Sequence, residues 1–443
     1  MKKSILASLL VLASSVFAIP QPEWFSSGVI YQISLRTFTR GGDFKSAEEM
    51  LPYVVTTGAN IVYLTPFVTM DTDADRSGWS HRQIASGFDS PKNPYRIADY
   101  AKVDPEYGTE KDLKSFVNRA HELGLKVMFD LVYLHAGPNN VIAKEIPDAF
   151  ARNEDGSVKT TVWHFPYLNF KSQAVREYLF ANMEHFVKDI GCDAFRCDVG
   201  DEVPEDFWNE AFVRMRKIKP DFVGLNEGIK PSHVRRAFNA NYSWDWSYAM
   251  RDAVLAKPGR KTLAERIRSR LEYEAKCPPD ALMAVFVENH DLATDSAKNR
   301  LDAKVSVEAG NAAYAALFLS RGVPVVWNGN EIADDGEVSF FGPVEHPARC
   351  ARTVDWSNAL TARGMARLAT IRKLAKLRRE TPALAVGTMK FVENTCPGRV
   401  LSFVRTAPDG KRVLVFVNLS PASAAVRAEG ISVDLDPWQY AIR

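Results

Sequence analysis

The sequence of 443 residues predicts an α/β protein: a (β/α)8 TIM barrel with a short insertion after strand 3 and a C-terminal antiparallel β-domain. Short apolar runs, typical of buried parallel strands, alternate with amphipathic helical patterns through most of the chain. No glycine-rich phosphate-binding turn follows the first run, which makes a doubly wound sheet the weaker alternative. From about residue 384 the pattern changes to β-type runs separated by turns, which predicts the additional domain.

The eight predicted strands share a short run of aliphatic or aromatic residues. They lie at residues 28–35, 60–65, 126–133, 193–198, 222–226, 241–246, 282–287 and 323–327. The sixth run, NYSWDW, is the weakest of them. Eight strands alternating with helices favour a closed barrel with the helices outside.

Helical patterns separate the strands. The clearest covers residues 110–123, where apolar residues recur at steps of three and four positions. These residues are Leu113, Phe116, Val117, Ala120 and Leu123. Acidic residues begin the segment and Gly124 ends it, as helix polarity and capping favour. Residues 361–379 predict a second, long and basic amphipathic helix.

Two long loops follow predicted strands at the end of the barrel where active sites of this fold lie. Residues 66–100 follow strand 2, and residues 136–170 after strand 3 are long enough for a small insertion subdomain. Long loops in compact domains are usually functional. The predicted organisation is a catalytic barrel over residues 19–383, which contains the insertion, and a β-domain over residues 384–443. The predicted strands of that domain are 400–406, 412–419, 431–435 and 439–443.

Residues 1–18 have the pattern of a secretory signal peptide. Lys2 and Lys3 precede a short apolar run, and Val16-Phe17-Ala18 places small residues at the spacing of a cleavage site. This run is too short to span a bilayer, and no later stretch reaches the roughly 20 apolar residues that a membrane helix needs. We therefore expect a secreted or periplasmic protein without a membrane span.

The composition, with 46% hydrophobic and 25% charged residues, excludes a disordered or collagen-like chain. The net charge of +2 argues against a nucleic-acid-binding protein, which would need a basic face. The five cysteines are too few and too dispersed for a disulfide scaffold, and they contain no C-x-x-C pair. Which of them pair, if any, is left open.

Three acidic residues stand at the ends of predicted strands: Asp198, Glu227 and Asp291, after strands 4, 5 and 7. A single acid at such a place more often caps a helix, but these three lie on one side of the predicted barrel. Arg196 points the same way as Asp198, because alternate residues of a strand share a face. We expect this arginine to keep the Asp198 carboxylate ionised, as a nucleophile requires.

The short motifs around these acids resemble those of the α-amylase family, glycoside hydrolase family 13. Four of them are DAFRCDVG (193–200), GLNEG (224–228), FVENHD (286–291) and MFDLVYLH (128–135). Three further similar segments are residues 93–127, FPYLNF (165–170) and GVPVVWNGNE (322–331). The seven segments occur in the order of the family over roughly residues 28–360, which makes the resemblance specific.

The resemblance implies a role for each matching position. Asp198 matches the nucleophile, Glu227 the general acid/base, and Asp291 the acid that holds sugar hydroxyls and stabilises the transition state. Arg196 matches the arginine that orients the nucleophile, and Asp130 matches a structural partner in the pocket. His135 and His290 match the histidines that bind the sugar at the cleaved position, and Tyr95 matches the tyrosine that stacks on that sugar. Asn289, beside His290, is a further candidate for substrate binding.

Retaining glycosidases use two carboxyls roughly 5–5.5 Å apart and form a covalent sugar intermediate. Because the acid must stay protonated near neutral pH, we expect a raised pKa for Glu227. Six tryptophans lie in or near the upper loops and strand ends, and each is expected in the core more often than as a sugar platform. They are Trp79, Trp163, Trp208, Trp244, Trp246 and Trp327.

The sequence departs from the family where calcium is concerned. Leu134 stands where the first motif usually has an asparagine that binds a structural calcium, and its side chain offers no oxygen to a hard cation. Asp71, Asp73 and Asp75 have the look of oxygen ligands, but the remaining ligands of a calcium loop are missing, so a solvated loop is the favoured interpretation. The resemblance implies no cofactor for the chemistry, and calcium is a weak alternative.

These observations predict an exported, retaining enzyme that hydrolyses α-1,4-glucosidic bonds of starch or maltodextrin-type glucans. The insertion of about 35 residues suggests an open cleft, and endo action is the favoured form. One alternative is an exo-acting α-glucosidase or an α-glucan transglycosylase with the same site. The other is a non-catalytic carbohydrate-binding protein, which would not need all three acids and Arg196. Protein partners are not indicated.

Overall fold

The computed structural model describes residue 19 and residues 21–255, 261–294, 300–339, 341 and 353–443. The expected signal peptide, residues 1–18, lies outside the described residues. None of the described helices is long and apolar enough to cross a membrane. Of the five cysteines, Cys192, Cys197, Cys277 and Cys396 are free, and Cys350 lies outside the described part of the chain.

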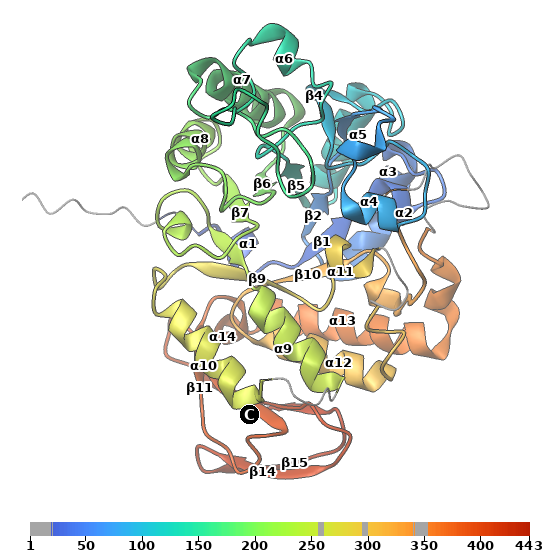
Figure 1. Cartoon of the computed structure of the whole chain (residues 1–443). Helices are drawn as coiled ribbons and strands as arrows, with labels where there is room; N and C mark the ends of the chain where they lie inside the picture. The colour runs from blue at the N-terminus through green and yellow to red at the C-terminus, as the bar shows by residue number, and fades with distance from the viewer. Residues whose placement is uncertain (1–18, 20, 256–260, 295–299, 340, 342–352) are drawn as a thin grey trace, which may run out of the picture.

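Eight parallel strands form a closed barrel in the order β1-β10-β9-β8-β7-β6-β5-β2 (Figure 1). They are β1 (Ile30–Ile33), β2 (Ile61–Leu64), β5 (Lys126–Leu131), β6 (Ala194–Cys197), β7 (Val223–Asn226), β8 (Ala240–Tyr242), β9 (Leu282–Phe286) and β10 (Val323–Trp327). The predicted barrel is confirmed. The sixth strand differs from the prediction, because it ends at Tyr242 and the following aromatic residues begin a helix, in which Trp246 and Met250 are buried at a helical spacing.

Helices surround the barrel. The longer ones are α3 (Phe44–Thr56), α5 (Glu110–Glu122), α7 (Gln173–His185), α8 (Glu205–Ile218), α9 (Trp244–Val254), α10 (Leu263–Glu274), α12 (Val307–Leu319) and α13 (Ala362–Glu380). The shorter ones are α1 (Glu23–Ser26), α2 (Leu35–Phe38), α4 (His81–Ala85), α6 (Ile142–Glu145), α11 (His290–Ala293) and α14 (Pro382–Ala385). The two helices predicted at 110–123 and 361–379 are α5 and α13. Helix α5 begins with a capping box between Thr109 and Asp112.

The interior of the barrel changes from apolar to polar along the strands. Alternate residues point inward, so Met128 and Asp130 of β5 share the inner face, as do Ala194 and Arg196 of β6. The lower positions form a buried apolar cluster. The positions at the carboxyl ends of the strands therefore carry the polar side chains inside the mouth of the barrel.

The two long loops contain structure of their own. The loop after β2 forms an antiparallel pair, β3 (Val68–Met70) and β4 (Ile97–Val103), with helix α4 between them. The insertion after β5 contains α6 and is held by isolated bridges such as His135 to Tyr167 and Phe150 to Leu168. Both loops stand over the carboxyl ends of the barrel strands, as predicted.

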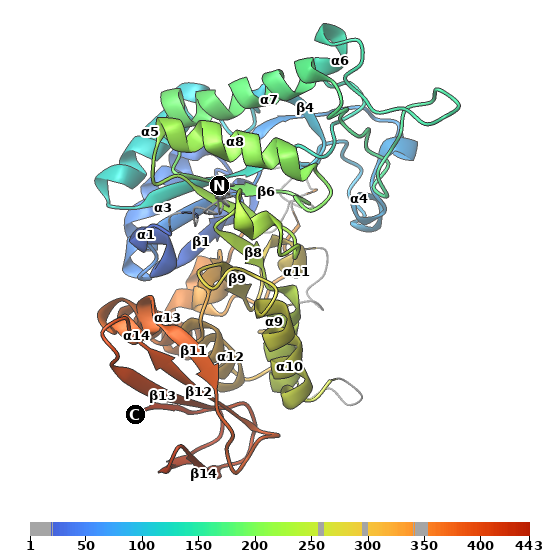
Figure 2. The same cartoon turned by 90° about the vertical axis from the view of Figure 1, so that its left-hand side faces the viewer.

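The C-terminal region forms two antiparallel sheets. The larger has the order β11-β12-β13-β16, with β11 (Thr388–Phe391), β12 (Val400–Thr406), β13 (Arg412–Asn418) and β16 (Tyr440–Ile442), and the smaller pairs β14 (Ala424–Ala428) with β15 (Ile431–Leu435). Figures 1 and 2 place these sheets beside α12, α13 and α14, at the end of the molecule away from α6 and α7. The boundary at residue 384 stays a prediction.

A buried arginine on α13 joins the amino end of the barrel to the helices around it. The Arg378 guanidinium donates to the carbonyl oxygens of Ser26, Ser27, Phe318, Gly322 and Leu384. Burial lowers the pKa of Arg378 to about 10, and among the described residues no carboxylate forms an ion pair with it. Backbone carbonyls alone therefore compensate this charge.

We expect Arg378→Ala to lower the free energy of unfolding by about 2–4 kcal/mol, because it leaves five buried carbonyls without their donor. Chemical denaturation measures the change. The neighbouring exposed Arg379 is the control, and Arg379→Ala should stay within about 0.5 kcal/mol of the wild type. Equal effects of the two substitutions would contradict this role for Arg378.

Candidate active site

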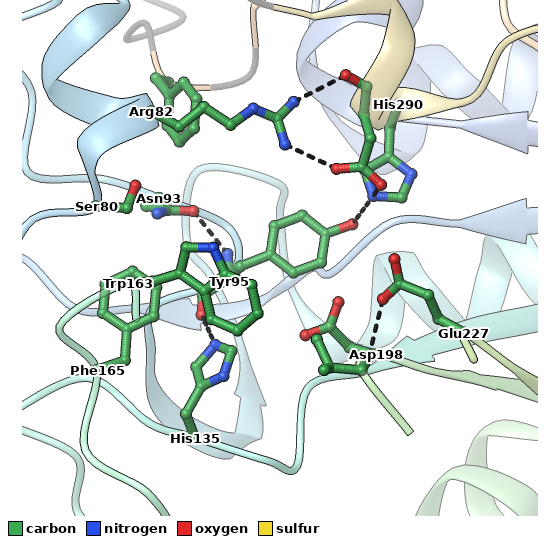
Figure 3. A pocket seen from close by; sticks show the side chains of 13 residues that line it. Ser80, Arg82, Asn93, Tyr95, His135, Trp163, Phe165, Asp198, Glu227 and His290 are labelled. Carbon is green, nitrogen blue, oxygen red and sulfur yellow. Dashed lines mark hydrogen bonds and ion pairs between the residues drawn. The ribbon is translucent and has the colours of Figure 1, made fainter. Parts of the chain in front are cut away.

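The three predicted acids meet in one pocket at the mouth of the barrel. Asp198 follows β6, Glu227 follows β7, and Asp291 lies in α11 after β9. Figure 3 shows Asp198 and Glu227 near Tyr95, which comes from the loop after β2, and Asp291 lines the same pocket. The residues that line the pocket are Ser80, Arg82, Asn93, Tyr95, His135, Trp163, Phe165, Asp198, Val199, Glu227, His290, Asp291 and Phe341.

Arg196 lies beneath the pocket and connects its carboxyls. Its Nη1 is 2.6 Å from Oδ1 of Asp130 and 2.9 Å from Oδ1 of Asp198, and its Nη2 is 2.8 Å from Oε2 of Glu227. The arginine side chain is fully buried. Asp130 and Arg196 are paired in register on β5 and β6, so strand pairing places them side by side. The predicted contact of Arg196 with Asp198 is present, and the contact with Glu227 is additional.

Burial raises the pKa of Glu227 to about 7, although Arg196 and the backbone N–H of Val199 act in the opposite direction. The expected raised pKa is therefore found. A carboxyl of this kind can be protonated near neutral pH and donate that proton.

The expectation that Arg196 keeps Asp198 ionised needs correction. Burial raises the pKa of Asp198 well above its usual value, Arg196 opposes this rise, and the negative charge of Glu227 adds to it. Both carboxyls contact the same guanidinium and repel each other, so they titrate as a pair. The two groups together retain a proton more readily than isolated carboxyls would.

Asp291 behaves in the opposite way. Its burial favours the neutral acid, but His290 and Arg82 lower the pKa of Asp291 to about 2. Arg82 Nη1 is 2.7 Å from Oδ1 of Asp291, and Nε2 of His290 is 3.3 Å from Oδ2. The third acid is therefore ionised at neutral pH, where Glu227 keeps a substantial protonated fraction, so the pocket offers one acceptor and one donor carboxyl.

A chain of hydrogen bonds orients the ring of His290. The amide Nε2 of Gln32 lies 2.7 Å from Nδ1 of His290, and Nε2 of His290 lies 2.7 Å from the Tyr95 hydroxyl. Because an amide N–H donates, Nδ1 accepts and Nε2 carries the proton. The hydroxyls of Tyr95 and Tyr63 both donate to Oδ2 of Asp130, at 3.1 and 2.6 Å. Asp130 is thus the common acceptor beneath the pocket.

A hydrogen bond joins His135 to the backbone of Tyr95. Nε2 of His135 is 2.9 Å from the carbonyl oxygen of Tyr95, and burial lowers the pKa of His135 to about 4. Nδ1 of this neutral ring is buried and has no hydrogen-bond partner among the described residues. A sugar hydroxyl donating to Nδ1 would satisfy it. The ring of Tyr95 lies nearly parallel to that of His290, with centroids 5.4 Å apart.

Asn289 is placed differently from the expectation. It is not one of the pocket-lining residues, and its side chain is buried and caps α11 by accepting the N–H of Leu292 at 3.0 Å. Asn289 therefore helps to position α11, which carries Asp291, and does not form part of the pocket wall.

The aspartates at 71, 73 and 75 form successive turns. Asp71 accepts the N–H of Asp73, Asp73 accepts that of Asp75, and Asp75 accepts that of Ser77. Asp71 is buried, not solvated, and also lies 3.8 Å from Arg96. Over the part of the chain that the structure describes, no three His, Cys, Asp or Glu side chains gather as a metal-binding group.

Several pocket residues have no counterpart in the sequence analysis. Ser80, Arg82 and Phe341 lie in loops without a recognisable pattern, and Asn93, at the start of the family-like segment 93–127, was not singled out. Of the six tryptophans, only Trp163 lines the pocket. Trp79, Trp208, Trp246 and Trp327 are buried, and Trp244 is partly buried against Tyr242 and Phe286.

A barrel that carries two carboxyls on one buried arginine, with a third acid across the same pocket, has the arrangement of a glycoside hydrolase. The family model "Alpha amylase, catalytic domain" matches residues 22–155 and 153–379, which is more than half of the chain. The chain belongs to the α-amylase family, glycoside hydrolase family 13.

Individual relatives are distant. The α-amylase MalA of Haloarcula japonica is 26% identical over 442 residues, which cover 95% of this chain and 59% of that protein. A cyclomaltodextrinase of Thermoanaerobacter pseudethanolicus is 24% identical over 451 residues, covering 90% and 71% of the two chains. The crystal structure of the noncanonic maltogenic α-amylase AmyB from Thermotoga neapolitana has a TM-score of 0.78 and 26% identity, and covers 94% of this chain and 96% of that one. This chain thus spans about three fifths of the length of MalA.

The pKa of Glu227 predicts how activity and stability depend on pH. Because the acid must be protonated, kcat/KM should fall on the alkaline side with an apparent pKa of about 7. Its folded-state pKa lies above the usual 4.5, so the stability linked to this group is present below pH 4.5 and is lost as the pH rises through about 7. Glu227→Gln removes that loss.

The measurement is thermal unfolding of the wild type and Glu227→Gln between pH 5 and pH 8. We expect the Tm of the variant, relative to that of the wild type, to rise with pH through this range. A constant difference would contradict the raised pKa. Glu202→Gln, at an exposed carboxyl outside the pocket, serves as the control.

Proposed function

We propose that this protein is a retaining hydrolase of α-1,4-glucosidic bonds in starch or maltodextrin-type glucans. The observation that carries the proposal is the ion-pair cluster in which Arg196 contacts both Asp198 and Glu227 under one pocket. Family membership supports the substrate class.

The geometry supports a two-step reaction. In the first step an Asp198 oxygen attacks the anomeric carbon, Glu227 gives its proton to the glycosidic oxygen, and the bond to the leaving glucan breaks. In the second step Glu227 takes a proton from water, whose oxygen attacks the anomeric carbon and releases Asp198. Asp291, ionised beside Arg82, accepts hydrogen bonds from sugar hydroxyls.

The names of relatives bear on the form of this activity. They include a cyclomaltodextrinase, a neopullulanase of Thermoactinomyces vulgaris and an intracellular maltogenic amylase of Bacillus subtilis. Endo action, which the sequence analysis favours, and removal of units from the chain end differ in the bond that is cleaved. Transfer to a sugar acceptor differs from hydrolysis in the group that attacks the covalent intermediate. Product analysis distinguishes them.

We expect Asp198→Asn to lower kcat on maltoheptaose by roughly 10⁴-fold or more, because the nucleophile is lost. The control is Cys197→Ser, one residue away, whose side chain faces the core between strands and helices. This control should keep near wild-type kcat. Proton NMR of the first sugar released from the wild type should show the α-anomer.

A folded wild type without turnover of soluble starch or maltoheptaose would contradict the hydrolase. If such a protein bound maltoheptaose, it would instead be the carbohydrate-binding protein that the sequence leaves as an alternative. Release of the β-anomer would contradict the retaining mechanism.

We also propose that the protein is exported. Support comes from the charged start, apolar run and small residues within residues 1–18. Expression of the full chain in a bacterium should yield an extracytoplasmic protein that begins at Ile19, as determined by mass spectrometry. Leu9→Arg, which interrupts the apolar run, should keep residues 1–18 attached and the protein in the cytoplasm. A wild-type chain that keeps residues 1–18 in the cytoplasm would contradict export.

A further inference from the structure

Arg82 crosses the pocket from the loop after β2 to the loop after β9. It belongs to α4, and its Nη1 donates to Oδ1 of Asp291 at 2.7 Å. Its Nη2 donates to the carbonyl oxygen of Asp291 at 3.2 Å and also to the Thr294 hydroxyl. The two residues are 209 positions apart in the sequence. One guanidinium therefore joins two loops that face each other over the mouth of the barrel.

The loop presents Arg82 from a fixed position. Ser80 caps α4 by accepting the N–H of Gln83, and the Gln83 side chain donates to the carbonyl oxygens of Ser90 and Pro91. His81 contacts His164 of the insertion edge to face, with ring centroids 5.0 Å apart. These contacts fix α4 to its own loop and to the insertion after β5. The helix that carries Arg82 is therefore held in place by both loops.

The position of Glu227 tells which end of the pocket Arg82 occupies. Glu227 protonates the leaving oxygen, so the leaving part of the glucan extends on the Glu227 side. Figure 3 shows Arg82, Ser80, Trp163 and Phe165 on the other side of Tyr95 from Asp198 and Glu227. This is the side from which the preceding sugar of an internal cleavage site would have to enter.

Asp291 is occupied by protein groups on that side. Arg82 holds Oδ1, while His290 and Asn289 lie 3.3 and 3.5 Å from Oδ2. The ring of Phe341 lies 6.0 Å from the Arg82 guanidinium, beside this ion pair. A chain that continued past the sugar on Asp198 would have to displace the ion pair, whereas a terminal sugar presents only hydroxyls, which Arg82 and Asp291 can bind.

We propose that Arg82 closes the glycone end of the pocket, so that the enzyme accepts the non-reducing terminal glucose of an α-glucan and releases glucose from the chain end. This inference rests on the proposed hydrolase activity and defines its substrate further. It replaces the open cleft expected from the short insertion, because the loop after β2 and residues Trp163 and Phe165 of the insertion form the wall. It favours the exo-acting alternative over endo action.

The test compares two maltopentaosides, both labelled at the reducing end. One has a free non-reducing terminal glucose, and in the other that glucose carries a 4,6-O-benzylidene group. The wild type should release glucose first from the free substrate and cleave the blocked one at least 100-fold more slowly. Chromatography of the labelled products reports the bond cleaved.

Arg82→Ala should open the closed end. The ratio of kcat/KM for the blocked substrate to that for the free substrate should rise at least tenfold, with cleavage at internal bonds. Arg82→Met, which keeps the length of the side chain without its donors, should raise the ratio less than Arg82→Ala does. The matched control is Arg76→Ala in the same loop, where an exposed arginine pairs with Asp89 at 3.2 Å, and this variant should keep the wild-type ratio.

The possible outcomes distinguish closure of the glycone end from the proposed hydrolase activity. Equal cleavage of both substrates by the wild type would overturn the closure and leave the hydrolase intact. Turnover of neither substrate by the folded wild type would overturn the hydrolase and the closure together. A folded Arg82→Ala that keeps the wild-type ratio, or loses both activities, would overturn the assignment of the closure to Arg82.

Discussion

The site depends on the burial of one cation, Arg196, among carboxylates. A guanidinium without solvent is costly unless charged partners compensate it, and the same is true of each carboxylate. Arg196 contacts Asp130, Asp198 and Glu227, and its guanidinium lies 5.4 Å from the ring centre of Tyr242. Neither the arginine nor the acids could occupy this place alone. The reacting groups therefore have fixed positions before any substrate arrives, because moving one of them would leave a buried charge without its partner.

Strand geometry provides this cluster, and a second network supports its edge. Registered pairing of β5 with β6 sets Asp130 beside Arg196, and the alternation of side chains turns both inward. Just after β9 the chain is anchored one residue before Asn289, where buried Glu288 contacts Arg251 at 3.2 Å and Arg300 at 3.0 Å. Burial acts against these charges, but the two arginines keep the pKa of Glu288 below its usual value. This anchor holds the segment that places His290 and Asp291 in the pocket.

Much of this was predictable from sequence, because strand and motif patterns are local. Eight apolar runs located the barrel strands, and the positions of Asp198, Glu227 and Asp291 at strand ends located the pocket. The role of Asn289 was not predictable, since a residue next to His290 can either face a ligand or cap a helix. The raised pKa of Asp198 was also missed, because it depends on Glu227 and on burial as much as on the adjacent Arg196. Arg82 carried no signal at all: α4 is a five-residue helix in an irregular loop.

Different charged neighbours account for the different states of two similar carboxyls in the pocket. Glu227 and Asp291 line the same pocket, and desolvation there favours the neutral form of each. Glu227 must share the cation with Asp130 and Asp198, so burial dominates and its pKa is raised to about 7. Asp291 has His290 at 3.3 Å and the Arg82 guanidinium at 2.7 Å, and these two neighbours lower the pKa of Asp291 to about 2. The barrel brings the acids together, and His290 on α11 with Arg82 from the loop after β2 then favours the ionised, accepting form of Asp291.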